Sequence, residues 1–121
     1  MSRILAGLLV LLVAGCAAPE VALPDSPAGR QLRWYMEAVN RTPISEEELK
    51  QHFTAGFLKD IPPEKINDLA RGLKELRLEK LTAAKPAELA GVTSIPFGQR
   101  YDTKISVDKT GKIDFLLFDP A

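Results

Sequence analysis

After an apolar block at the start of the chain, the apolar residues fall into a helical pattern. Four of them recur at intervals of three and four positions: Leu32, Tyr35, Met36 and Val39. This spacing predicts a helix that buries one face. Ser26 and Pro27 stand where an N-cap and a first-turn proline are favoured. We therefore expect a helix from Pro27 to near Asn40.

A second helix is predicted after Ser45. Ser45 and Glu48 have the spacing of a capping box, in which each residue satisfies the backbone of the other. Ile44 and Leu49 are placed to form a hydrophobic staple across the helix start. On this helix Leu49 and Phe53 are expected to face the interior.

A third helix is predicted after the proline pair Pro62-Pro63. Its apolar residues share one face: Ile66, Leu69, Ala70 and Leu73. Polar residues stand between them, which is typical of a helix that lies on a core and faces solvent. Three helices are thus predicted before any strand.

The end of the chain changes to alternation, which predicts strands. Four residues alternate with polar neighbours: Tyr101, Thr103, Ile105 and Val107. Residues 108–111 read Asp-Lys-Thr-Gly, which is turn sequence, and residues 112–118 form the next strand. We expect a β-hairpin here.

Two weaker strand patterns precede this hairpin. Alternation begins at about Leu76, and residues 89–97 form another strand. Gly91 and Pro96 suggest a bend or an edge position for that second strand. Helices followed by antiparallel strands predict an α+β domain, with the N-terminal helices packed on one face of a curved antiparallel sheet.

The apolar block at the start has the layout of a secretory signal peptide. Arg3 gives a short basic start, and an apolar run covers residues 4–13. A helix that spans a bilayer needs roughly 20 apolar residues, so this run is too short for a permanent transmembrane helix. The signal ends in a motif that resembles a lipobox, which the lipoprotein signal peptidase cuts before a lipidated cysteine: Val13-Ala14-Gly15-Cys16.

Cys16 is the only cysteine, which excludes a disulfide within the chain and favours a thiol used for lipid attachment. An ordinary signal peptide with a chance cysteine is the alternative. We expect residues 1–15 to be the signal peptide, 16–25 the lipidated cysteine and tether, and 26–121 the α+β domain. The lipid would hold the protein to the cell membrane, outside the cytoplasm. Ala17, rather than Asp, follows the cysteine, which in a Gram-negative host resembles the signal for sorting to the outer membrane.

The mature chain is small and nearly neutral. Removing the 15 residues before Cys16 leaves 106 of the 121 residues, which is enough for one domain. Without Arg3 the chain carries 15 basic and 16 acidic side chains, with no large block of either sign. This balance argues against nucleic acid as a partner. The partners that we expect are the membrane, through the lipid anchor, and an envelope protein, a cell-wall fragment or a small apolar ligand.

Short motifs along the mature chain carry a family resemblance. They are Ala28-Gly29-Arg30-Gln31-Leu32-Arg33-Trp34, Ile44-Ser45, Phe53 with Phe57-Leu58, Pro62-Pro63, and Val107-Asp108 with Gly111-Lys112-Ile113 and Pro120. On these motifs the chain resembles the N-terminal domain of the β-lactamase-like proteins typified by a clavulanic-acid gene-cluster product and by mycobacterial and actinobacterial lipoproteins. The resemblance implies a cone-type fold of the ketosteroid-isomerase, nuclear-transport-factor-2-like or cystatin kind.

The chain departs from those proteins in one respect. Their N-terminal domain precedes a serine-hydrolase-like domain, whereas this sequence stops at Pro120-Ala121, so we expect a stand-alone module. Residues 106–109 match S-x-x-K and residues 109–111 match K-T-G, which are signatures of penicillin-interacting enzymes. Those enzymes need the two motifs on separate elements. Here the matches share Lys109 within one predicted turn, and we interpret them as turn sequence.

No recognisable catalytic or metal-binding set stands out. His52 is the only histidine, and its place on the second predicted helix favours a partly buried boundary position over a triad or a metal site. An isomerase would need a carboxylate base and a proton donor, for which Asp102 with Tyr101 or Tyr35 are the candidates. Adjacent residues of a strand point to opposite faces, which disfavours Asp102 with Tyr101. Trp34, Tyr35 and Tyr101 are candidates for lining a pocket, with core packing as the alternative.

Two functions follow from these observations. The first is a membrane-anchored lipoprotein with a non-catalytic, cone-type domain that serves as a binding or accessory module in the cell envelope, without cofactor or metal. The second is a small isomerase-like pocket enzyme. The second rests on fold analogy alone, and a fold of this kind hosts many functions.

Overall fold

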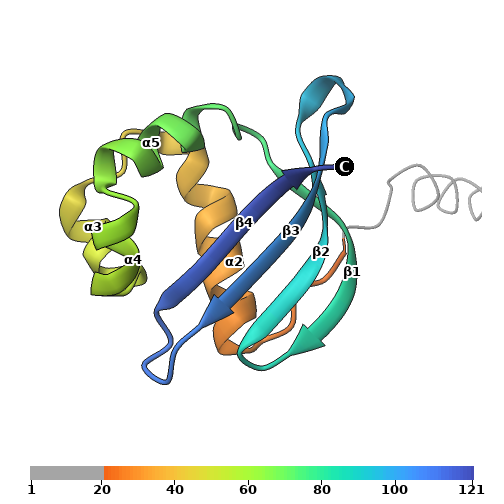
Figure 1. Ribbon diagram of the computed structural model, residues 1–121. Coiled ribbons are helices and arrows are strands. Elements are labelled where there is room, and N and C mark those ends of the chain that lie inside the picture. Colours follow the sequence, from red (N-terminus) through yellow and green to blue (C-terminus); the bar gives the residue numbers. More distant parts are fainter. Residues whose placement is uncertain (1–20) are drawn as a thin grey trace, which may run out of the picture.

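A computed structural model describes residues 21–121 of the chain. The predicted signal peptide with Val13, Ala14 and Gly15, and the predicted lipidation site Cys16, lie outside these residues. Helices come first and strands follow, so the domain is α+β, as predicted (Figure 1). The elements are α2 (Pro27–Ala38), η1 (Val39–Arg41), α3 (Glu46–His52), α4 (Ala55–Asp60), α5 (Pro63–Arg71), β1 (Arg77–Lys85), β2 (Glu88–Ser94), η2 (Pro96–Gly98), β3 (Arg100–Val107) and β4 (Ile113–Pro120).

The first helix begins and ends close to where the sequence predicts. The Ser26 hydroxyl accepts a hydrogen bond from the backbone N–H of Gly29 at 3.0 Å, and Pro27 opens the first turn. α2 ends at Ala38, and a short 3-10 turn continues to Arg41. Its predicted apolar face is turned to the core, with these side chains buried: Leu32, Tyr35 and Val39.

The region of the second predicted helix contains two helices. α3 follows Ser45, whose hydroxyl accepts the N–H of Glu48 at 3.1 Å. The Glu48 carboxylate binds side chains of α2 and η1, which replaces the second half of the predicted capping box. A further N-cap, Thr54, accepts the N–H of Phe57 at 3.1 Å and starts α4. The described chain therefore has four α-helices, where the sequence predicts three.

The third predicted helix is α5, and one part of its predicted face is wrong. Pro63 opens it, and these apolar residues are buried: Ile66, Ala70 and Leu73. Leu69, however, is 57% exposed, because α5 borders open space at this position. Asn67 is buried on the same helix, and its side-chain amide binds the N–H of Ile44 at 2.7 Å and the carbonyl of Ile44 at 3.0 Å. These two bonds hold α5 to the segment before α3.

The strands form one antiparallel sheet in the order β1-β2-β3-β4, so each strand pairs with its neighbours in the sequence. The predicted hairpin is confirmed as β3 and β4, with Ile105 opposite Leu116. Asp108 stabilises the turn, because its carboxylate accepts the N–H groups of Thr110 and Lys112 at 2.9 and 3.1 Å.

β2 lies between β1 and β3, so of the two predicted alternatives for this strand, a bend or an edge position, the edge position is wrong. Gly91 instead marks a close approach of two strands. A side chain there would put its Cβ 2.3 Å from the carbonyl oxygen of Lys80 on β1. β1 carries register shifts on both sides of Lys80 and Leu81, the residues that Gly91 approaches. Pro96 falls beyond β2, in η2.

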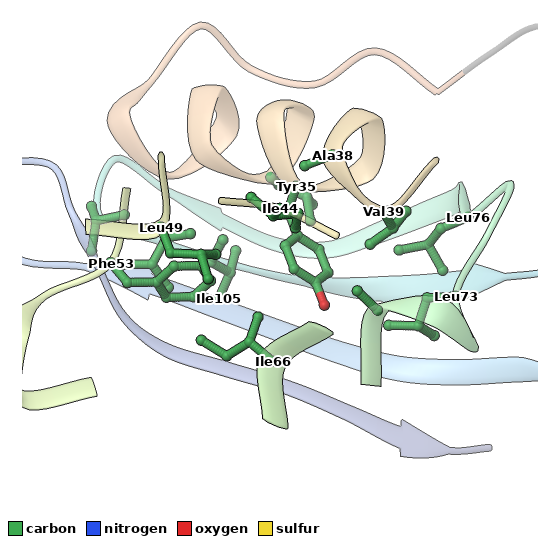
Figure 2. Packing of buried hydrophobic residues seen from close by; sticks show 14 of the residues in the cluster. Tyr35, Ala38, Val39, Ile44, Leu49, Phe53, Ile66, Leu73, Leu76 and Ile105 are labelled. Atoms are coloured by element: carbon green, nitrogen blue, oxygen red, sulfur yellow. The ribbon is translucent and has the colours of Figure 1, made fainter. Parts of the chain in front are cut away.

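The core lies between α2 and one face of the sheet (Figures 1 and 2). Leu89 of β2 and Ile105 of β3 lie opposite each other, and both are buried. Thr93 and Thr103 are buried in the same core, and their hydroxyls form a hydrogen bond of 2.8 Å. Burial of an aliphatic side chain of this size stabilises a fold by about 1.5–3 kcal/mol, so the apolar residues of this layer contribute to the stability of the domain.

α3, α4 and α5 gather on the β4 side of the sheet (Figure 1). The N–H of Thr54 donates to the carbonyl of Ile113 at 3.0 Å, next to a parallel bridge between Phe53 and Ile113. The junction of α3 and α4 is thereby tied to the first residue of the edge strand. Among the helices of residues 21–121, none has the length and apolar character that crossing a bilayer requires.

Candidate functional site

An apolar cavity of about 410 Å³ lies between the helices and the β4 side of the sheet. Residues of α2, α4, α5, β3 and β4 line it, together with Phe53 at the end of α3 and with the segment after α5. Leu69 of α5 and Leu117 of β4 are 57% and 46% exposed and mark its rim. The cavity is therefore open to solvent.

Aromatic rings form much of the cavity wall: Tyr35, Phe53, Phe57, Tyr101 and Phe118. The rings of Phe53 and Phe57 stack with their centroids 4.7 Å apart. Phe118 stacks on Tyr35 at 5.7 Å and meets Tyr101 edge to face at 6.2 Å. These pairings hold the rings in defined orientations. The remaining described residues of the wall are aliphatic or glycine, so none of the described lining residues is charged.

Tyr35 carries the deeply buried polar group of this wall. It is 3% exposed, and within residues 21–121 its hydroxyl makes no hydrogen bond. No fully enclosed side-chain nitrogen or oxygen in that part of the chain lacks a partner, so the hydroxyl must retain contact with open space. Figure 2 shows its oxygen extending from α2 between Ile66 and Leu73, which both line the cavity. Burial raises the pKa of the Tyr35 phenol above its ordinary value, so the group stays protonated.

Two of the three predicted pocket residues line this cavity. Tyr35 and Tyr101 belong to its wall, and Trp34 does not. Trp34 stacks on His52 with ring centroids 3.8 Å apart and planes 8° from parallel, and its indole N–H donates to Glu48 at 2.9 Å. Successive residues of a helix point about 100° apart, so Trp34 and Tyr35 face different surroundings.

Sequence reasoning missed the wall that α4 and β4 contribute. Phe57 and Ile61 come from α4 and its C-cap, and Leu116 and Phe118 come from β4. Two signals were available. Thr54 before a pair of apolar residues four positions apart is typical of a short capped helix, and the alternation in β4 indicates which of its side chains share a face.

A polar cluster joins η1 to α3 away from the cavity. Arg41 binds Glu48 through two nitrogens at 2.9 and 2.6 Å, and it also binds Glu37 at 2.7 Å. The hydrogen bonds from Arg41, and then the one from Trp34, lower the pKa of Glu48 to about 2. A carboxylate held ionised by a guanidinium is suited to fixing two elements together and unsuited to proton transfer near neutral pH.

His52 is a partly buried residue at the edge of this cluster, as the sequence predicts. Its Nδ1 lies 2.9 Å from Oε1 of Gln31. The amide nitrogen of Gln31 donates to the carbonyl of Gly111 at 2.8 Å, which orients Oε1 toward the ring, so Nδ1 of His52 carries the proton. Burial lowers the pKa of His52 and favours the neutral ring. These contacts assign His52 a structural role between α2, α3 and the β3–β4 turn.

The residues considered for an isomerase do not meet at the cavity. Tyr101 lines it, whereas Asp102 is exposed on the other face of β3, opposite Asp119 of β4. The S-x-x-K and K-T-G residues lie at the end of β3 and in the turn, where Asp108 accepts the hydroxyl of Thr110 at 2.6 Å. Within residues 21–121, no group of three or more His, Cys, Asp or Glu side chains could hold a metal ion.

Residues 23–113 match the sequence profile of a protein family described as ORF 12 gene product N-terminal. The chain belongs to this family. The part that matches the ORF 12 N-terminal family runs from before α2 to the first residue of β4, and it includes Tyr35 and Tyr101. A comparison with curated proteins finds no match.

Proposed function

We propose that this protein is a lipid-anchored lipoprotein of the bacterial cell envelope, with a non-catalytic domain that binds a small apolar ligand. The observation that carries the proposal is the open cavity of about 410 Å³ with an aromatic and aliphatic wall. Small-molecule sites are mostly apolar concavities of about 300–1,000 Å³ with a few polar groups. Burial of apolar ligand surface against this wall supplies the driving force.

The anchor is supported by the lipobox-like motif before Cys16 and by the absence of any other cysteine in the sequence. Attachment to the cell membrane or outer membrane would keep the domain at the envelope. Cys16→Ser should abolish incorporation of radiolabelled palmitate and release the protein from the membrane fraction. Normal membrane retention of this variant, with no label in the wild type, contradicts the anchor and leaves the cavity proposal untouched.

We further propose that the domain has the cone-type fold of the nuclear-transport-factor-2-like proteins and is related to the N-terminal domain of clavulanate-cluster-type β-lactamase-like proteins. Support comes from helices that precede a four-stranded antiparallel meander and cover one of its faces. The isomerase-like alternative requires a carboxylate base at the cavity. The described lining residues include neither Asp nor Glu, so the geometry favours binding without chemistry.

The binding role is tested with a matched pair of variants. Leu69 and Phe115 are exposed apolar residues, at 57% and 42%, but only Leu69 lines the cavity. Leu69→Asp adds a charge to the rim, where a bound apolar molecule would strip water from it. We expect it to weaken binding of the neutral fluorescent probe N-phenyl-1-naphthylamine about tenfold or more, which corresponds to about 1.4 kcal/mol.

Phe115→Asp is the control, because it adds the same charge to a comparable exposed site outside the cavity. It should leave the dissociation constant of the probe unchanged. Equal loss of affinity in both variants, or no saturable binding by the wild type, contradicts the proposed function. Thermal unfolding of each variant establishes that the domain is folded under the conditions of the titration.

A further inference from the structure

We propose that the ligand is a neutral, hydrocarbon-rich molecule with an oxygen atom that accepts a hydrogen bond from the hydroxyl of Tyr35. The inference rests on the proposed binding role of the cavity and adds the chemistry of the ligand. Tyr35 is 3% exposed, and its hydroxyl opens into the cavity without a partner among residues 21–121. A ligand atom would supply the missing partner.

The packing of Tyr35 does not require its hydroxyl. The ring stacks on Phe118 at 5.7 Å and meets Phe53 edge to face at 6.5 Å, and phenylalanine could make both contacts. Buried polar groups in proteins are nearly always hydrogen-bonded, since a hydroxyl taken from water loses bonds that the interior must replace. This phenol meets no protein acceptor among residues 21–121, so a ligand that fills the cavity and displaces water from it is favoured when it supplies an oxygen in the place of that water.

The cavity wall indicates that this molecule is uncharged. No lining residue of the described chain is a Lys, Arg or His that could pair with an anion, nor an Asp or Glu that could pair with a cation. A charged group that left water here would lose its hydration without compensation. The raised pKa of Tyr35 keeps its proton in place, so the phenol donates to a carbonyl, ether or hydroxyl oxygen.

The cavity also indicates where the polar contact lies. Tyr101 supplies the other hydroxyl of the wall, and it is only partly buried. The hydroxyl of partly buried Tyr101 can keep its hydrogen bonds to water when a ligand is bound, whereas a ligand that fills the cavity displaces water from the hydroxyl of the deeply buried Tyr35. The contact that distinguishes an oxygenated ligand from a pure hydrocarbon should therefore be made at Tyr35.

Isothermal titration calorimetry with three compounds of similar size tests the inference. They are 2-acetonaphthone, which has a carbonyl oxygen, 2-ethylnaphthalene, which lacks it, and 2-naphthoate, which is charged. The mature full chain is titrated as wild type, as Tyr35→Phe and as the control Tyr101→Phe. We expect Tyr35→Phe to weaken binding of 2-acetonaphthone about fivefold, as loss of one neutral hydrogen bond predicts.

The other arms separate this result from loss of folding. Binding of 2-ethylnaphthalene should be unchanged in Tyr35→Phe, Tyr101→Phe should bind both neutral compounds like the wild type, and 2-naphthoate should bind the wild type at least tenfold more weakly than the ketone. The inference is overturned if Tyr35→Phe keeps full affinity for the ketone, if the loss occurs in Tyr101→Phe instead, or if naphthoate binds as well as the ketone. Wild-type protein that binds neither neutral compound overturns the proposed function itself.

Discussion

Gly91 offers a severe test of the sheet geometry. Its β2 backbone approaches β1 so closely that a Cβ would lie 2.3 Å from the carbonyl oxygen of Lys80 and 3.2 Å from the Cα of Leu81. Both contacts are with backbone atoms, so a change of side-chain rotamer cannot relieve them. Gly91→Ala must therefore push the two strands apart by about 1 Å, which disturbs their pairing in the middle of the strands. Overpacking of a well-packed interior costs about 1–3 kcal/mol, and we expect the upper part of this range.

The assay is chemical and thermal unfolding followed by circular dichroism. For a domain of this size, a loss of 2–3 kcal/mol lowers Tm by roughly 10 °C or more. Gly56→Ala is the matched control, because a Cβ at Gly56 meets nothing within 4 Å and lies in α4. That change should stabilise the protein by about 0.5 kcal/mol. A Gly91→Ala variant as stable as the wild type would refute the close approach of β1 and β2.

Two further predictions concern hydrogen bonds away from the sheet. Asn67→Leu should destabilise the domain by about 2–3 kcal/mol in urea unfolding, because it removes the partners of the backbone N–H and carbonyl of Ile44, now bonded at 2.7 and 3.0 Å. Unchanged stability would show that these two bonds do not hold α5 to the segment before α3. Glu48 has its pKa lowered from 4.5 to about 2 by Arg41, so its stabilising contribution is complete above about pH 4.5 and is lost as the pH falls toward 2. Wild-type Tm should thus fall more steeply than that of Glu48→Gln between these pH values, and parallel curves would show that the ion pair contributes nothing.

The parts of the fold that depend on local chemistry could be predicted from the sequence. Ser26 and Ser45 cap helices because a short hydroxyl side chain reaches the backbone three residues ahead, whatever the rest of the chain does. The β3–β4 hairpin was predictable for the same reason, since Asp108 and Gly111 favour a turn between two alternating segments. Gly111 has a φ of +86°, which glycine adopts without steric cost.

The parts that depend on what lies opposite could not be predicted. Leu69 has the right spacing for the buried face of α5, but that face borders a cavity at this residue instead of another element. α4 is six residues long and has no fully buried residue, so beyond its N-cap and one apolar pair it carries too little periodicity to separate it from α3. Trp34 and Tyr35 are adjacent aromatic residues, and only the arrangement of α3 and the sheet decides which of them meets open space. A cavity is made by elements far apart in the sequence, and no single segment encodes it.

The two sides of the cavity differ in rigidity. On one side stands a sheet whose strands are cross-linked along their length, and on the other stand short helices, of which α4 has no residue fully inside the protein. Small displacements of the helices would allow ligands of different width to bind, while the sheet keeps its position. Shape would then discriminate poorly among such ligands, and selectivity would depend on the phenol of Tyr35, which is fixed on the long helix α2.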